Sequence, residues 1–207
     1  MRFTCTSWAR AVTLSAAIAL GIPFPAAGVL TGCHREPDLP TFGVVPDFSL
    51  TDQVGNPFTR ETMKGRTWIA AFVFTRCPSA CPRVTRAMRD LQVKAVQRNA
   101  KIHLVSFSVD PEFDTPVVLR SYAKEYSADL VNWSFVTGNA EMIQKTAEQG
   151  LKIAAQGKAD PTKADFGITH GTQLVLVDAR GTIRGYYASN DDAALARLLD
   201  DATRLAS

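Results

Sequence analysis

Residues 68–82 read Trp-Ile-Ala-Ala-Phe-Val-Phe-Thr-Arg-Cys-Pro-Ser-Ala-Cys-Pro and carry the strongest structural signal in the chain. The first eight of them form a nearly continuous apolar run, which is typical of a central strand buried on both faces of a sheet. Cys77 and Cys81 follow at once, and apolar residues at helical spacing continue from Val84 to Ala100. The stretch therefore predicts a buried strand, a cysteine-bearing loop and a helix in direct succession.

Further elements are predicted on both sides of this stretch. Residues 47–52 alternate apolar and polar side chains like a strand, and residues 53–56 form the turn of a hairpin. The remaining patterns predict strands at 102–109, 133–136, 172–177 and 183–187, a helix at 115–126, and a hairpin turn at 178–181. Asn139 and Asn190 are expected to cap the two helices that follow them.

The order of these elements predicts the fold class. Strands and helices that alternate along a chain are typical of an α/β layer structure with parallel central strands. The hairpin near the C-terminus adds antiparallel strands, so we expect a mixed central sheet flanked by helices. This order is that of a thioredoxin-like fold with an N-terminal hairpin extension and an inserted strand–helix unit.

The composition is that of one globular domain. The chain has 207 residues, enough for a sizeable core, and 46% of them are apolar. The formal net charge of +3 is too small for a nucleic-acid-binding surface, and no run of like charges suggests an interaction tail. We therefore expect no nucleic-acid partner.

The first 32 residues have the pattern of an export signal. Arg2 and Arg10 are their only charges, and the stretch from 11 to 30 is apolar and rich in small residues. Pro23 and Pro25 interrupt this stretch, which argues against a membrane-spanning helix. We expect the protein to be exported.

The end of this segment predicts a lipid anchor. Residues 30–33, Leu-Thr-Gly-Cys, resemble a bacterial lipoprotein box, in which the cysteine is lipidated and becomes the mature N-terminus. The expected organisation is a lipoprotein signal peptide at 1–32, a membrane tether at 33–46 that begins with the lipidated Cys33, and the folded domain at 47–207. The protein would lie in the bacterial cell envelope, on the extracytoplasmic side of a membrane. A plain signal peptide with a chance cysteine, or an uncleaved anchor, is the alternative.

Processing at Cys33 leaves one close pair of thiols. Of the four cysteines, Cys5 leaves with the signal and Cys33 carries lipid, so Cys77 and Cys81 remain, with three residues between them. Their place after a central strand matters because open α/β sheets bind ligands at the carboxyl ends of their strands. The start of a helix, with Arg76 and Arg83 beside it, is expected to favour the thiolate form.

Three interpretations of the pair follow. It is a structural disulfide or two inert thiols, a dithiol that exchanges with other disulfides, or part of a metal site. Dithiol exchange in thioredoxin uses two intervening residues and a cis-proline opposite the pair. The corresponding segment here, residues 167–173, contains His170 and no proline.

His170 favours the metal site. In a thioredoxin-like topology the loop that carries it faces the cysteine loop, so two thiolates and one imidazole would converge. This soft set of three ligands suits Cu(I), and a fourth oxygen ligand would let it hold Cu(II). Zinc also accepts cysteine and histidine ligands. His34 and His103 have no converging partner and are interpreted as incidental or structural.

Asp110 is expected at the carboxyl end of the strand at 102–109, near the cysteine loop. It would orient a metal ligand through a hydrogen bond, or serve only in the turn. Asp114 is interpreted as turn and cap chemistry, with Asp114 or Thr115 as the N-cap of the next helix.

These motifs together resemble the Sco/SenC family of cytochrome c oxidase assembly proteins. The resemblance covers nearly the whole mature domain and rests on residues 46–48, 75–82, 108–116, 133–138, His170 and 177–181. It departs from the common family pattern at Arg76, where histidine is frequent, and at residues 78–80, which are less acidic than usual. Neither departure removes a ligand.

The resemblance implies copper bound by Cys77, Cys81 and His170, and its delivery to the dinuclear copper centre of cytochrome c oxidase subunit II or to another copper protein. A metallochaperone of this kind needs no catalytic turnover. The family also implies an alternative, a thiol–disulfide oxidoreductase that reduces the target's cysteines, or a redox sensor, with Cys77 and Cys81 as the redox-active pair. A peroxiredoxin-like peroxidase is disfavoured because the expected approach to a single peroxidatic cysteine is absent from the sequence.

Overall fold

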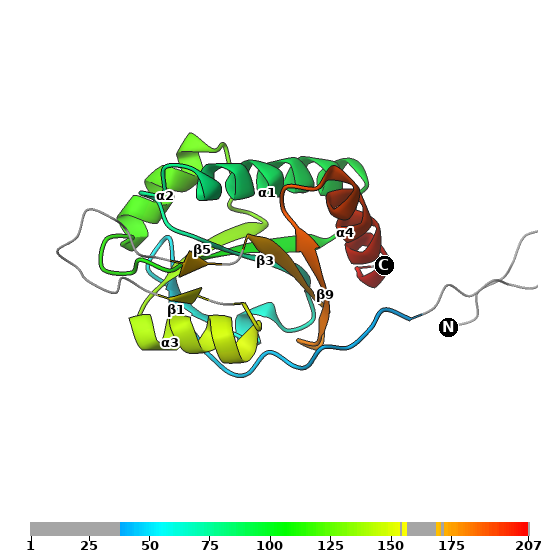
Figure 1. The fold of residues 1–207 in the computed structure, drawn as a ribbon, viewed down its shortest axis with the longest axis horizontal. Helices are drawn as coiled ribbons and strands as arrows, with labels where there is room; N and C mark the ends of the chain where they lie inside the picture. Colours follow the sequence, from blue (N-terminus) through cyan, green and yellow to red (C-terminus); the bar gives the residue numbers. More distant parts are fainter. Residues whose placement is uncertain (1–37, 154, 157–168, 171, 207) are drawn as a thin grey trace, which may run out of the picture. The chain divides into compact units, whose positions relative to one another are not determined.

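The computed structural model describes residues 38–153, 155–156, 169–170 and 172–206 (Figure 1). At 155–156 and 169–170 it describes the backbone alone. The predicted signal peptide, the lipidation site Cys33 and the first part of the predicted tether lie outside the described residues.

Seven strands form the central sheet, in the order β2-β1-β5-β4-β3-β8-β9. β3, β4 and β5 run parallel, whereas β1 and β8 pair antiparallel with β5 and β3. The predicted mixed sheet and its N-terminal hairpin are therefore confirmed. The strands are β1 (Ser49–Asp52), β2 (Pro57–Thr59), β3 (Thr67–Val73), β4 (Ile102–Ser108), β5 (Trp133–Thr137), β8 (Gln173–Val177) and β9 (Ile183–Ala188).

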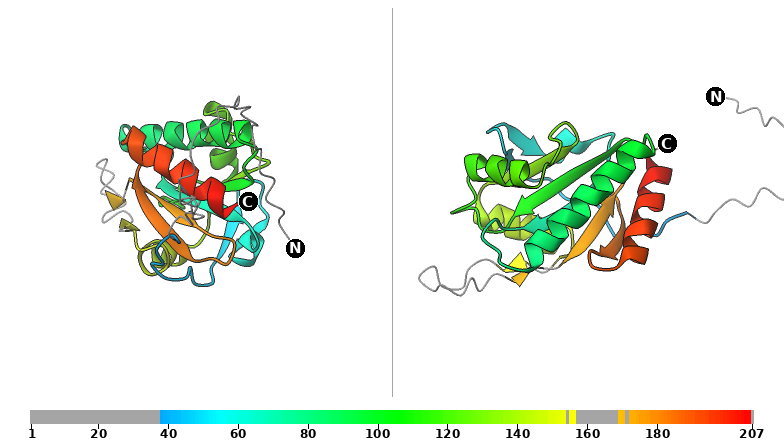
Figure 2. Two further views of the ribbon diagram at one scale, coloured as in Figure 1. Left: turned by 90° about the vertical axis from the view of Figure 1, so that its right-hand side faces the viewer. Right: turned by 90° about the horizontal axis from the view of Figure 1, so that it is seen from above.

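Helices cover both faces of this sheet, as Figures 1 and 2 show. The helices are α1 (Ala80–Gln97), α2 (Pro116–Glu125), α3 (Ala140–Lys145) and α4 (Asp192–Leu205), with a 3-10 turn η1 (Glu61–Met63) and a π turn η2 (Thr146–Gly150). α1, α2 and α4 lie on one side and α3 on the other. Every residue of β3 and β4 is buried between these layers, as the continuous apolar runs predict.

No helix in the described part of the chain is both long enough and apolar enough to span a bilayer.

Helix starts agree with the sequence in part. The Asn139 side chain caps α3 by accepting a hydrogen bond from the Met142 amide, as expected. The expected cap at Asn190 is wrong, because the next residue, Asp191, accepts from the amides of Ala193 and Ala194 instead. A carboxylate at this position also interacts favourably with the helix dipole.

α1 begins at Ala80, four residues before the apolar periodicity starts at Val84. Cys81 therefore belongs to the first helical turn rather than to a loop. Pro82 is compatible with this start, because the first turn of a helix has no backbone partner for its N–H groups.

Ordered contacts with the domain begin before the expected boundary at Asp47. Phe42 and Val45 donate backbone hydrogen bonds to the carbonyls of Ile183 and Gly181, both at 2.9 Å. The Val45 side chain is fully buried, and Arg184 Nη2 donates to the Leu39 carbonyl. The last residues of the predicted tether thus run along the outer edge of β9.

A short ladder that the sequence patterns did not predict precedes β8. β6 (Ala155–Gln156) pairs antiparallel with β7 (Thr169–His170), so Ala155 lies opposite His170. The predicted loop before β8 therefore has strand backbone at His170.

Candidate metal centre

The cysteine loop, defined as residues 74–81, runs from the end of β3 into the first turn of α1, which contains Cys81. β3 and β4 pair in register through their whole length, from Thr67 opposite Ile102 to Val73 opposite Ser108. The Val109 amide then donates to the Val73 carbonyl at 2.9 Å. The loop therefore leaves the carboxyl ends of two adjacent parallel strands, the place predicted for it.

Both cysteines of the loop are thiols, and their sulfurs take part in the loop's backbone hydrogen bonding. The Cys81 amide donates to Cys77 Sγ at 3.4 Å, and the Phe74 amide donates to Cys81 Sγ at 3.4 Å. Cys77 is half-buried, whereas Cys81 is fully buried. The two sulfurs are therefore held on one turn, one accessible and one beneath it.

The two thiols differ in acidity for physical reasons that can be named. Burial acts to raise the pKa of Cys77, but hydrogen bonds from the backbone amides of Cys81 and Ser79 and from the Cys81 thiol outweigh it, so this pKa is lowered. Burial raises the pKa of Cys81 far above its ordinary range. The predicted contribution of the helix start is thus present, and it acts on Cys77. This arrangement favours a thiolate at Cys77 next to a protonated Cys81.

Arg76, expected to favour the thiolate, directs its guanidinium at Asp110. Its Nε and Nη2 donate to Asp110 Oδ2 at 3.2 and 2.5 Å, and its Cζ lies 4.1 Å from the centroid of the Phe113 ring. Asp110 is buried, and its own amide donates to Ser108 Oγ at 3.1 Å. Asp110 therefore contacts the residue directly before Cys77.

Asp114 makes a second contact with the cysteine loop, which the sequence interpretation missed. Thr115 is the N-cap of α2, accepting from the Val118 amide, so Asp114 is not the cap. Asp114 is fully buried and accepts from the Thr75 amide at 3.1 Å, from Thr75 Oγ1 at 2.5 Å and from Ser108 Oγ at 2.6 Å. Burial raises its pKa, although the hydrogen bonds from Ser108 and Thr75 act in the opposite direction.

His170 is described by its backbone only, so its side chain lies outside the described part of the molecule. β8 begins three residues later and pairs antiparallel with β3, with Val175 opposite Ala70. The start of β8 consequently lies beside the end of β3 from which the cysteine loop departs. Among the described side chains, which leave out His170, no group of three or more His, Cys, Asp or Glu could hold a metal ion.

His103 has the structural role expected of it. It is buried, and its Nε2 lies 3.0 Å from Ser134 Oγ on the neighbouring strand. Burial, with a smaller contribution from the charge of Arg66, lowers its pKa to about 4. The imidazole is therefore neutral at physiological pH.

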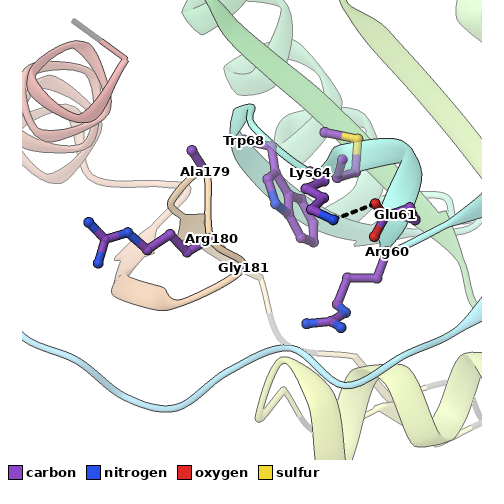
Figure 3. Close-up of a pocket in the computed structure, with 8 residues that line it drawn as sticks. Arg60, Glu61, Lys64, Trp68, Ala179, Arg180 and Gly181 are labelled. Carbon is purple, nitrogen blue, oxygen red and sulfur yellow. Dashed lines mark hydrogen bonds and ion pairs between the residues drawn. The ribbon is translucent and has the colours of Figure 1, made fainter.

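A concave site, drawn in Figure 3, includes Trp68 and so lies at the start of β3, the end opposite the cysteine loop. Its volume is about 330 Å³, and its lining residues are Arg60, Glu61, Met63, Lys64, Trp68, Ala179, Arg180 and Gly181. These residues include no thiol or imidazole, and none of them is a site residue predicted from the sequence. Its ion pairs, Lys64–Glu61 at 2.8 Å and Arg60–Asp47 at 2.6 Å, are largely exposed. We therefore take the cysteine end as the candidate metal centre.

Comparisons with known proteins show what the whole chain is similar to. The family model described as SCO1/SenC matches residues 37–205. A protein from Stutzerimonas stutzeri that is named for copper binding is 36% identical over 151 residues, which cover 72% of this chain and 71% of that protein.

Solved structures of similar proteins extend this result. A SCO1/SenC family lipoprotein from Bacillus anthracis is 30% identical, with a TM-score of 0.73 over 80% of this chain and 96% of that one. BsSco, a member of the Sco family of cytochrome c oxidase assembly proteins described as having a disulfide switch, is also 30% identical, with a TM-score of 0.71 over 82% and 96%. ScoI of Bradyrhizobium japonicum with copper bound is 25% identical, with a TM-score of 0.61 over 78% and 99%.

Proposed function

Because the chain belongs to the SCO1/SenC family, we propose that it is a copper metallochaperone of the bacterial cell envelope that supplies the dinuclear copper centre of cytochrome c oxidase subunit II. The Stutzerimonas relative is named for copper binding, and the Bradyrhizobium relative has a structure with copper bound. Both support copper as the metal. The description of BsSco as an oxidase assembly protein supports the choice of target.

The proposed ligands are Cys77, Cys81 and His170. The observation that carries this proposal is the pair of sulfurs held on one turn at the carboxyl end of β3, with the pKa of Cys77 lowered. Thiolates are soft ligands that select Cu(I), so Cys81 would release its proton to solvent as it binds the metal. An imidazole completes a three-ligand set. The start of β8 beside this end of the sheet supports His170 as the third ligand, because it lies three residues earlier.

The difference in burial between the two cysteines suits delivery as well as binding. A copper ion held by the half-buried Cys77 can be approached by a thiolate of the target, which would replace one ligand at a time. Cys81 lies beneath the surface and would be the last sulfur to dissociate from the copper ion. Copper would therefore leave by ligand exchange rather than by release into solution.

The proposed anchor is lipid on Cys33. The likeness to a Bacillus anthracis lipoprotein supports it, together with the box at residues 30–33. A diacylated cysteine provides enough buried methylene groups for stable attachment to a membrane. The domain would then work on the extracytoplasmic side of that membrane.

Anaerobic titration of the full chain with Cu(I) tests the ligand set. We expect one tight equivalent of copper in the wild type and its loss in Cys77→Ser, Cys81→Ser and His170→Ala. His34→Ala is the matched control, because it removes a histidine with no proposed role. Full copper affinity in His170→Ala would contradict the proposed site.

A thiol–disulfide oxidoreductase or redox sensor is the second candidate, and the asymmetry of the two thiols favours it. An accessible cysteine of lowered pKa beside a buried thiol is the arrangement in which the first attacks a disulfide and the second resolves it. Such exchange does not need His170. Reduction of a target disulfide by His170→Ala at the wild-type rate, without copper binding by the wild type, would favour this candidate.

A further inference from the structure

The turn after β4 reaches the cysteine loop at two successive residues. We define this acidic turn as residues 110–114. Asp114 accepts from the amide and the hydroxyl of Thr75, and Asp110 accepts from the guanidinium of Arg76. Thr75 and Arg76 are the two residues directly before Cys77. The acidic turn therefore holds the cysteine loop from outside.

The acidic turn is itself rigidly held. The Asp114 and Phe113 amides donate to the Asp110 carbonyl at 2.8 and 3.1 Å. Ser108 Oγ joins the two acids, because it donates to Asp114 Oδ2 and accepts from the Asp110 amide. The turn is thus tied together by its own hydrogen bonds, and both carboxylates face the cysteine loop.

Burying the carboxylates of Asp110 and Asp114 costs free energy. Asp114 is fully buried and Asp110 is 4% exposed, and burial of a carboxylate is unfavourable unless its partners compensate for the lost water. For Asp114 the compensation is incomplete, since its pKa is raised. Two of the three groups that donate to Asp114, the Thr75 amide and the Thr75 hydroxyl, belong to the cysteine loop.

We propose that Asp114 and Thr75 are positioning residues, which fix the cysteine loop and thereby set how firmly the Cys77–Cys81 pair holds copper and how easily the pair is oxidised. The proposal rests on the proposed function for its copper part only. The Asp110–Arg76 ion pair is a second contact between the acidic turn and the cysteine loop. The Arg76 side chain in it is partly exposed, and the Phe113 ring lies against its guanidinium.

Thr75→Val isolates the effect of the hydroxyl, because valine has nearly the same shape. Thr75→Ser restores the hydroxyl and is the rescue variant. Thr67→Val is the matched control. Thr67 is a buried threonine at the start of β3, the strand that leads to the cysteine loop, and its hydroxyl donates to the Leu205 carbonyl at 3.1 Å. All three variants are made in the full chain.

Two quantities are measured in addition to the free energy of unfolding. The first is the rate at which a Cu(I) chelator removes copper, and the second is the reduction potential of the Cys77–Cys81 pair without copper. Residues that orient metal ligands typically change metal affinity by about ten- to a hundredfold, so we expect at least about tenfold faster copper removal in Thr75→Val. A tenfold change in the thiol–disulfide equilibrium corresponds to about 30 mV in the potential.

The expected result is a change of both quantities in Thr75→Val, recovery in Thr75→Ser and no change in Thr67→Val at a similar loss of stability. If Thr75→Val and Thr67→Val behave alike in both measurements, Thr75 is only a structural residue and the proposal is overturned. Absence of copper binding in the wild type would remove the proposed function but leave the potential as a test of the positioning role.

Discussion

Asp110 and Asp114, at the carboxyl end of β3, differ in exposure from the two ion pairs beside the pocket at its other end. At the carboxyl end, Asp110 and Asp114 are buried and their partners belong to the cysteine loop. At the other end, the Arg60–Asp47 pair has side chains 36% and 86% exposed, and both side chains of the Lys64–Glu61 pair are more than 70% exposed. Exposed pairs contribute little to stability, whereas buried carboxylates fix the groups that donate to them. The carboxylates at the cysteine end therefore fix geometry, whereas these two exposed pairs at the other end form a solvated surface. Asp178 in the β8–β9 turn lies outside this contrast, because it is buried and pairs with Arg184 at 3.1 Å.

The strongest test of this contrast is Asp114→Ala. The change leaves the Thr75 amide, the Thr75 hydroxyl and the Ser108 hydroxyl without their acceptor in a buried site. We expect a loss of about 3 kcal/mol in the free energy of unfolding, since each unsatisfied buried donor is costly. Urea denaturation followed by circular dichroism measures it.

Asp114→Asn is the matched variant for this experiment. Because burial raises the pKa of Asp114, the ionised acid is disfavoured in the folded state, and its contribution to stability decreases as pH rises through the folded pKa. We therefore expect a much smaller loss at neutral pH for the asparagine, which is neutral and keeps one acceptor. An equal loss in both variants would show that the charge is needed for stability.

The next largest effect is expected in an acid titration, and it comes from a buried histidine that belongs to neither group of charges. His103 is buried near the start of β4, away from the cysteine end, and its pKa is lowered to about 4. A lowered histidine pKa means that the unfolded state binds more protons below pH 6.5, so stability falls as pH decreases toward 4. We expect a loss of about 2 kcal/mol between pH 7.5 and pH 5. In His103→Gln this part of the pH dependence should disappear from the urea denaturation series.

A smaller effect on stability is expected from the partly exposed contact between Phe113 and Arg76. Phe113→Leu removes the ring face against which the Arg76 guanidinium lies but keeps an apolar side chain. Partly exposed contacts of this kind contribute about 0.5–1 kcal/mol. Thermal unfolding compared with that of Phe113→Tyr, which retains the ring, measures the contact. If Phe113→Leu and Phe113→Tyr are equally stable, the contact between the ring and Arg76 does not contribute to stability.

The smallest effect is expected at the other end of β3. A double-mutant cycle with Lys64→Ala and Glu61→Ala should give a coupling of no more than about 0.5 kcal/mol, because both side chains are largely exposed. It should fall further at high salt. A coupling free energy above about 1 kcal/mol would show that the exposed Lys64–Glu61 pair contributes to stability as a buried pair does.

The main elements of the fold could be predicted from the sequence because the signals are local. The apolar run that forms β3 requires burial on both faces, and the cysteines follow it directly, so their place at the end of a central strand follows from strand order. The start of α1 at Ala80 could not be placed in this way, because residues 80–82 have no apolar periodicity and the N-cap residue Ser79 makes no side-chain cap hydrogen bond.

Strand order predicted that Asp110 lies near the cysteine loop, but other contacts between distant segments could not be predicted. Asp114 accepts from Thr75, 39 residues earlier, and only the parallel pairing of β3 with β4 brings the two together. The pairing of Phe42 and Val45 with the start of β9 likewise depends on a strand near the other end of the chain. His170 as a copper ligand stays a prediction, supported by where β8 begins.

The segment along β9 has a mechanical consequence. The backbone of Phe42 and Val45 is bonded next to the β8–β9 turn, and Trp68 at the start of β3 pairs with Val177 just before that turn. β3 has seven residues, so the cysteine loop lies about 20 Å further along the strand. Tension arriving through the residues before Asp38 would load these hydrogen bonds and the edge strand first. The cysteine loop thus lies at the far end of β3 from the place where the N-terminal segment is attached.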